Sequence, residues 1–337
     1  MLQYLYTADT VANAVSAFKI NSDGTLTTST GGGTSSPFIV RGAASGTLLV
    51  GNSALQVFTV DASTGAIHHS ETQTPGPADL ALDDAGNFAY QININPCQAG
   101  SCRDISAYRV VNGTLQSIGG VAIKEGGTGP YTGAPVNPVF EAIDQASRHL
   151  FIAGSPGPGP TPGVEFRAIT RNSDGTLGAV SPRDRDLCAN VAQMVATSKA
   201  NVSFVYNSCG KDHMIQWTAF DNGSGNVVSS GQALTSGTPQ PLAIDPSGTF
   251  LLAGDTTGNV IEIYSIDQTT GTISETQKAA TGNHPSGIIF DSTGKFVYVT
   301  NRDSNNISAY GLNNGTMQAI GTYSTGQGPA SATIVRP

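Results

Sequence analysis

The stretch Pro285-Ser-Gly-Ile-Ile-Phe-Asp-Ser-Thr-Gly294, followed by Lys295-Phe-Val-Tyr-Val-Thr-Asn301, decides the fold of this chain. Two short apolar runs are joined there by Asp-Ser-Thr-Gly, a tight turn in which glycine accepts the positive φ that the turn needs. Two more runs follow at 306–310 and 316–320, joined by an Asn-Asn-Gly turn. The unit is therefore predicted to be a meander of four short antiparallel strands.

The same order of runs and turns recurs along the whole chain. The stretches 77–86 and 239–248 repeat the first run and its Asp-x-x-Gly turn. Seven starts of the first run can be identified, at Pro37, Pro77, Pro138, Val191, Pro239, Pro285 and Pro329. Seven starts of the second run can be identified, at Leu2, Leu48, Phe88, Leu150, Phe204, Phe250 and Phe296. The mean spacing of roughly 48 residues is the size of one four-stranded propeller blade.

These repeats predict an all-β fold, a seven-bladed β-propeller with four-stranded antiparallel blades, formed by residues 1–337 as a single domain. The chain begins with a second-type run and ends with a lone first-type run at 329–335. The closing blade should therefore combine the C-terminal strand with the three N-terminal strands, which leaves no long open sheet edge inside the ring. A β-sandwich followed by a second β domain is the alternative, but it does not explain seven repeats in one order.

Composition excludes several classes of protein. Charged residues make up only 12% of the 337 residues, and 41 glycines and 18 prolines punctuate the chain. These features argue against coiled coils and helical bundles. The formal net charge of −8 argues against a nucleic-acid partner. No apolar run approaches the roughly 18 residues that a membrane helix requires, so no membrane span is expected.

Four cysteines fall into two pairs by spacing. Cys97 and Cys102 bracket a short loop, and Cys188 and Cys209 flank two strand-like runs that would place them opposite each other in a hairpin. Both pairs are predicted to be disulfides, and free structural thiols are the alternative. Disulfides indicate an oxidising compartment, so we expect a secreted, periplasmic or cell-surface protein whose leader was removed before residue 1.

Long loops of consecutive blades are expected to form one wall around the channel mouth, and scarce charged residues gather on them. Glu141 and Asp79 fall instead early in first-type runs, near the channel. Arginine can hold a carboxylate or phosphate, and a carboxylate or histidine can act as general base. The candidate catalytic residues are Arg185, His213, Glu141 and Asp186. The candidate ligand-binding residues are Arg183, Tyr131, Asp79, Gln193, Lys211, Arg302 and Arg103. For the run 183–186, mutual Arg–Asp pairing that orders a loop is the structural alternative. No metal site and no cofactor are expected, and we expect a monomer.

The stretch Tyr298-Val-Thr-Asn301, with Ser304-Asn-Asn-Ile-Ser-Ala-Tyr310 after it, resembles the YVTN repeat of secreted and surface propellers. The wider group is the lactonase-type seven-bladed propellers, which includes 6-phosphogluconolactonase-like and carboxymuconate-cyclase-like proteins. The resemblance covers the whole chain and implies the propeller fold. It also implies a site at the channel mouth, where His, Arg and carboxylate side chains act on a lactone.

Three functions are compatible with this resemblance. The first is an exported binding module that holds a small molecule or a glycan at the channel mouth. The second is a lactonase-like hydrolase or cyclase acting on a sugar-acid or muconate-type lactone. The third is a polysaccharide lyase or glycosidase. Active relatives are expected to carry His or Arg-His where this chain has Asn137-Pro138 and Val191-Ala192-Gln193, which favours the first hypothesis.

Overall fold

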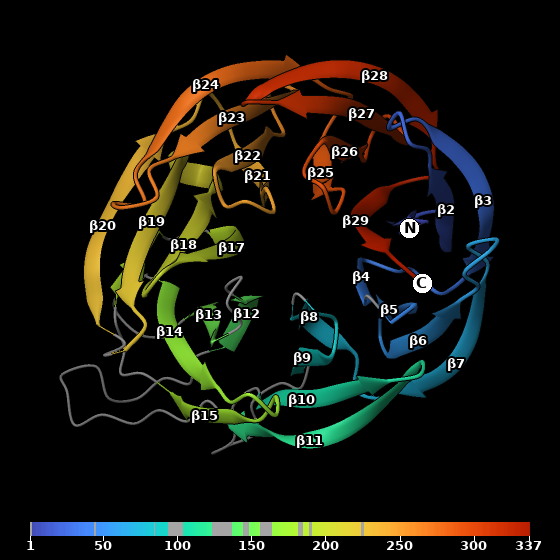
Figure 1. Cartoon of the computed structure of the whole chain (residues 1–337), viewed down its shortest axis with the longest axis horizontal. Helices are drawn as coiled ribbons and strands as arrows, with labels where there is room; N and C mark the ends of the chain where they lie inside the picture. Colours follow the sequence, from blue (N-terminus) through green and yellow to red (C-terminus); the bar gives the residue numbers. More distant parts are fainter. Residues whose placement is uncertain are drawn as a thin grey trace.

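The computed structural model describes residues 2–43, 45–83, 85–93, 104–122, 137–143, 148–155, 164–180, 185–188, 191–223 and 226–337. In these residues, seven antiparallel sheets stand around a central axis (Figure 1). Six sheets contain four strands and one contains five. The predicted all-β seven-bladed propeller is therefore confirmed.

Blades 1 to 3 occupy the first half of the chain, and the first strand of each lies nearest the axis (Figure 1). Blade 1 contains β4 (Ile39–Ala43), β5 (Thr47–Gly51), β6 (Leu55–Val60) and β7 (Ile67–Gln73). Blade 2 contains β8 (Pro77–Leu82), β9 (Phe88–Asn93), β10 (Asp104–Val111) and β11 (Thr114–Ala122). Blade 3 contains β12 (Asn137–Ile143), β13 (His149–Ser155), β14 (Val164–Arg171), β15 (Leu177–Val180) and β16 (Arg185–Leu187).

Blades 4 to 6 follow the same plan. Blade 4 contains β17 (Val191–Lys199), β18 (Val202–Cys209), β19 (Met214–Asp221) and β20 (Val227–Leu234), with a short 3-10 turn at Gly210–Asp212 between β18 and β19. Blade 5 contains β21 (Pro239–Ile244), β22 (Phe250–Asp255), β23 (Val260–Ile266) and β24 (Ile273–Ala280). Blade 6 contains β25 (Pro285–Phe290), β26 (Phe296–Asn301), β27 (Asn306–Asn313) and β28 (Thr316–Ser324).

Blade 7 joins the two ends of the chain. The C-terminal strand β29 (Pro329–Val335) is its inner strand, and it pairs with β1 (Tyr4–Asp9), which is followed by β2 (Ala14–Ile20) and β3 (Leu26–Gly33). Leu5 lies opposite Ile334 in this antiparallel ladder. The predicted closing blade is confirmed, and the ring is closed by main-chain hydrogen bonds between its first and last strands.

Aromatic residues of the second strands fasten each of four blades to the next one. The Tyr206 hydroxyl donates a hydrogen bond of 2.8 Å to the carbonyl of Gly271, which lies in the β23–β24 turn of the neighbouring blade. Gly271 has φ +76°, and a Cβ there would lie 2.4 Å from Phe204 Cδ1, so the turn accepts glycine alone without rearrangement. The same contact recurs at three other blade junctions, as Tyr6–Gly65, Tyr90–Gly175 and Tyr298–Gly24.

Candidate functional site

The seven inner strands surround a cavity of about 520 Å³ at the centre of the ring. Its wall contains both apolar and polar residues. The polar residues in the wall are Arg41, Asp79, Glu141, Gln193, Gln240, Ser286, Ser331 and Thr333. We call this space the channel cavity. Three of its polar residues carry a formal charge, and they lie on three consecutive inner strands, β4, β8 and β12.

Several polar residues of the channel cavity hold neighbouring blades together. The Ser331 hydroxyl oxygen accepts a 3.0 Å hydrogen bond from the Val40 amide, and Thr333 accepts one of 2.8 Å from the Gly42 amide. The Ser286 hydroxyl donates to the Pro329 carbonyl. A side chain on one inner strand therefore satisfies a backbone group on the next, which would otherwise be buried without a partner.

Asp79 and Gln193 have the same structural position in their blades. Each follows a β-bulge at the start of its inner strand. Asp79 Oδ2 accepts a 3.0 Å hydrogen bond from the Glu141 amide, and Gln193 Oε1 accepts one of 2.8 Å from the Leu242 amide. Both side chains thus bridge to the following inner strand, and a neutral amide does this as well as a carboxylate.

Arg41 crosses from blade 1 to blade 2. Its Nε donates a 2.7 Å hydrogen bond to the Leu80 carbonyl, and its Nη1 donates one of 3.0 Å to the Val40 carbonyl. Its Nη2 lies 3.6 Å from Asp79 Oδ1. The side chains are 30% and 14% exposed, respectively, so this ion pair is only partly screened by solvent.

Several neighbouring groups shift the pKa of the Asp79 carboxyl, in opposite directions. Burial raises the pKa of its carboxyl, while the Arg41 charge lowers it. The amides of Glu141 and Leu80 donate to its two oxygens and lower the pKa further. The net direction is upward, because the cost of removing the charge from water exceeds these gains.

Glu141 is the unusual group of the channel cavity. Its side chain is 5% exposed, and neither carboxyl oxygen has a hydrogen-bond partner among the residues that the structure describes. Burial raises its pKa well above the ordinary value of 4.5, and the neighbouring Asp79 raises it further. The Arg41 charge opposes this shift, as do the nearby amides of Ala81 and Ile92, which do not reach normal hydrogen-bond geometry. A buried carboxyl without a partner is costly, and such groups cluster at functional sites.

The charged residues that were predicted around the channel mouth come together only in part. Lys211 and His213 lie exposed in the turn between β18 and β19, where His213 has φ 49°. Arg185 and Asp186, expected on a loop, form strand β16, which pairs with β14. Arg302 is exposed directly after β26. Of these five residues, Lys211, His213 and Arg302 do not line the channel cavity as far as the structure describes it, and the proposed roles of all five remain predictions.

One predicted disulfide is observed. Cys188 and Cys209 are bonded, with Cα atoms 5.9 Å apart, and the bridge ties the segment after β16 to the end of β18. The predicted Cys97–Cys102 pair lies outside the described residues, as do the ligand-binding candidates Arg103, Tyr131 and Arg183.

The sequence placed Glu141 and Asp79 on first-type runs near the channel, where the structure has them, and the candidate Gln193 lies on an inner strand too. It did not single out Arg41. A signal was present, because Arg41 is a charged residue within the first-type run that begins at Pro37, in a chain with few charges. The run aligns with those at Pro77 and Pro138, so Arg41 falls on an inner strand, as Asp79 and Glu141 do.

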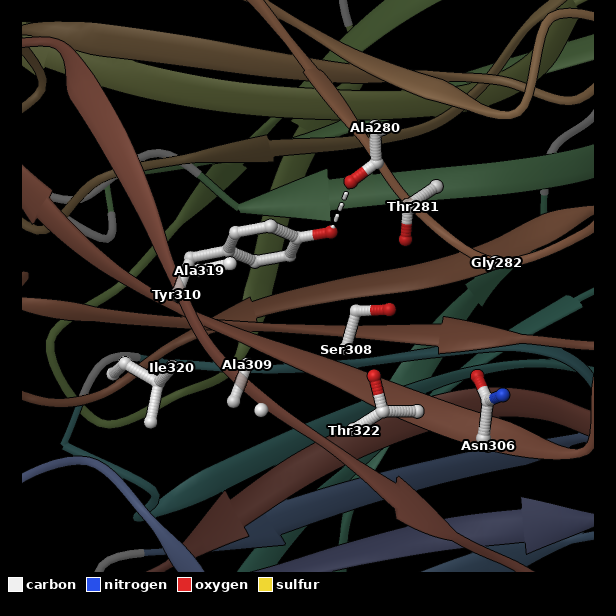
Figure 2. A pocket seen from close by; sticks show the side chains of 11 residues that line it. Ala280, Thr281, Gly282, Asn306, Ser308, Ala309, Tyr310, Ala319, Ile320 and Thr322 are labelled. Carbon is white, nitrogen blue, oxygen red and sulfur yellow. Dashed lines mark hydrogen bonds between the residues drawn. The ribbon is translucent and has the colours of Figure 1, made fainter.

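A second cavity of about 360 Å³ lies between the outer strands of blades 5 and 6 (Figure 2). Several of its polar groups form hydrogen bonds within the protein. The Tyr310 hydroxyl donates a 2.6 Å hydrogen bond to the Ala280 carbonyl, as Figure 2 shows. Asn306 and Ser308 both accept from the Asn301 amide group. No ionisable carboxyl, histidine or arginine lines this cavity, so the channel cavity is the better candidate for chemistry.

In the part of the chain that the structure describes, no three His, Cys, Asp or Glu side chains gather as a metal site would require. No helix in the described ranges has the length and apolar character needed to cross a membrane.

Comparison with known proteins agrees with this architecture. Residues 179–290 match the family model described as "Lactonase, 7-bladed beta-propeller". No curated protein matches the chain. The resemblance to lactonase-type seven-bladed propellers is confirmed by this match together with the observed fold.

Solved structures of similar shape cover nearly the whole chain. A candidate 6-phosphogluconolactonase from Bacteroides uniformis has a TM-score of 0.77 at 17% identity over 99% of both chains. Another from Bacteroides fragilis has a TM-score of 0.75 at 18% identity, over 99% of this chain and 98% of its own. The periplasmic gluconolactonase of Pseudomonas aeruginosa has a TM-score of 0.73 at 15% identity over 99% of both chains. At these identities, the likeness establishes the fold.

Proposed function

We propose that this lactonase-type propeller binds a small polyhydroxylated molecule of the sugar-lactone class in its channel cavity. The observation that carries the proposal is Glu141, whose carboxyl is buried in the cavity wall with no hydrogen-bond partner in the described part of the chain. A neutral carboxyl of this kind can donate one hydrogen bond and accept another, as a hydroxyl-rich ligand requires. The cavity volume of about 520 Å³ lies within the range of small-molecule sites.

The charge of Asp79 supports the same site. Gln193 makes the equivalent bridge without a charge, so joining the blades does not require a carboxylate at position 79. The carboxylate and Arg41 thus add a polar arc to a wall that is otherwise neutral. An arc of this kind can orient the hydroxyl and carbonyl groups of a sugar derivative.

Lactone hydrolysis is the second candidate function, and the raised pKa of Glu141 favours it specifically. Water adds to the lactone carbonyl, the ring C–O bond breaks, and the leaving oxygen takes up a proton to give a hydroxy acid. A carboxyl that keeps its proton at higher pH can supply that proton, and Arg41 can polarise the carbonyl. The family match and the periplasmic gluconolactonase of similar fold make a sugar lactone the first substrate class to test.

We further propose that the protein is exported and monomeric. The Cys188–Cys209 disulfide fits an oxidising compartment. Size-exclusion chromatography with light scattering, and thiol counting on protein from its native host, test these two points.

Calorimetric titration with D-glucono-1,5-lactam, a hydrolysis-resistant analogue, tests binding. The wild type should bind saturably, and Glu141→Leu should lose most of the affinity. The control Lys199→Ala, an exposed residue outside the cavity, should bind as the wild type does. Equal binding by Glu141→Leu, or no binding of any sugar derivative by the wild type, would refute the proposal. Titration of acid released from the lactone, corrected for spontaneous hydrolysis, tests the second function.

A further inference from the structure

The channel cavity contains a single cationic side chain. Among the described residues that line it, Arg41 is the one lysine, arginine or histidine. Phosphate and carboxylate ligands are recognised through several cationic or amide donors, and a bidentate arginine is the strongest of these. Whether the cavity can hold an anion therefore depends on how Arg41 is already engaged.

Two nitrogens of Arg41 donate hydrogen bonds within the protein, and the third lies beside a carboxylate. Nε donates to the Leu80 carbonyl and Nη1 to the Val40 carbonyl. Nη2 faces Asp79 at 3.6 Å. An oxyanion that approached the Nη2 side of the guanidinium would therefore meet the Asp79 carboxylate beside it.

Asp79 is firmly positioned beside Arg41. Its two oxygens accept hydrogen bonds from the amides of Leu80, at 2.9 Å, and Glu141, at 3.0 Å. The carboxylate balances the arginine charge and would repel a second anion in a site of reduced dielectric. A phosphorylated ligand would have to displace this pair or lie against it.

We propose, on the basis of the channel function above, that Asp79 sets the charge class of the ligand, so that the channel cavity takes an uncharged sugar derivative and rejects phosphorylated or carboxylated analogues. The position is a selectivity element because its structural task does not require its charge. Gln193 carries out that task two blades further along the ring with a neutral amide.

A matched pair of ligands, D-glucitol and D-glucitol 6-phosphate, tests this inference on the wild type by calorimetry. The uncharged member should bind at least about tenfold more tightly, and millimolar inorganic phosphate should not compete with it. Equal or tighter binding of the phosphate ester, or competition by phosphate, overturns the inference and leaves the channel function standing. If neither ligand binds, the proposed function fails and this inference fails with it.

The variant Asp79→Asn tests whether the cavity gains affinity for the phosphate ester when the charge is removed. Asparagine keeps an oxygen for the Glu141 amide but removes the charge beside Arg41. The affinity of the variant for the phosphate ester, relative to its affinity for glucitol, should rise by about tenfold over the wild-type ratio. Lys199→Ala should keep the wild-type preference. An Asp79→Asn protein that folds, as judged by circular dichroism, and still rejects the phosphate ester would contradict the role of Asp79. If the variant does not fold, the wild-type ligand pair decides.

Discussion

Two arcs of the channel wall both join neighbouring inner strands, but they do so with different side chains. On the charged arc, formed by β4, β8 and β12, Asp79 accepts the Glu141 amide and Arg41 reaches the Leu80 carbonyl. On the neutral arc, formed by β17, β21, β25 and β29, Gln193 accepts the Leu242 amide. Each contact joins one inner strand to the next.

Comparing the two arcs shows which polar groups the closed ring requires and which it does not require. Closing the ring requires an oxygen near the amide of the next inner strand, and glutamine, serine or threonine supplies it. Charge and an unpartnered acid are not required for this and are costly to bury. The charged arc therefore carries features that packing alone does not explain.

The largest expected effect is on stability at Arg41. In Arg41→Met, Asp79 loses its counter-charge and the Leu80 carbonyl loses its donor. Removing one partner of a fully buried ion pair costs about 3–5 kcal/mol, and partial exposure here reduces the expected loss to roughly 2–3 kcal/mol. Urea unfolding measures it. A loss no larger than that of Gln193→Ala would remove the contrast between the arcs.

The second effect tests the neutral arc. Gln193→Ala leaves the Leu242 amide without its acceptor, and the expected cost is about 1–2 kcal/mol. Gln193→Glu, which restores an acceptor, should recover most of this loss near neutral pH. If alanine is as stable as glutamine, the bridging role assigned to this side chain is wrong.

A smaller effect is expected where the chain ends meet. Ser331→Ala removes the acceptor of the Val40 amide, although Thr333 still bridges the same two strands. We expect a loss of about 1 kcal/mol. The double variant with Thr333→Val should lose more than either single variant, and thermal unfolding of all three proteins measures this. Full additivity would show that the two contacts are independent.

The last expected effect concerns Glu141, and it is measured as the change of protein stability with pH. The folded-state pKa is raised above 4.5, so the folded protein binds more protons than the unfolded chain above that pH. Stability should therefore fall as pH rises from about 4.5 to the folded-state pKa. Glu141→Gln should match the wild type at lower pH and become relatively more stable above it. Parallel melting curves of the two proteins across this range would contradict the raised pKa.

The sequence predicted the repeating unit because its signals are local. Asp-x-x-Gly turns and strand-length apolar runs specify a meander within one blade, and the seven predicted inner-strand starts agree with β4, β8, β12, β17, β21, β25 and β29. The Cys188–Cys209 pairing was also readable, because the two cysteines lie near each other across one hairpin. The charged residues around the channel mouth were harder to predict. Arg185 and Asp186, for example, were expected on a loop but fall in strand β16.

The sequence by itself determined the number of blades, the strand order and the closure of the ring, since each follows from repeats and turns of nearby residues. Only the tertiary structure decided which polar residues meet. Arg41, Asp79 and Glu141 come together across blade boundaries, although the last two are 62 positions apart in the sequence. It also decided that Glu141 is buried without a partner while Gln193 is bridged, because burial and hydrogen bonding depend on neighbours that only the closed ring supplies.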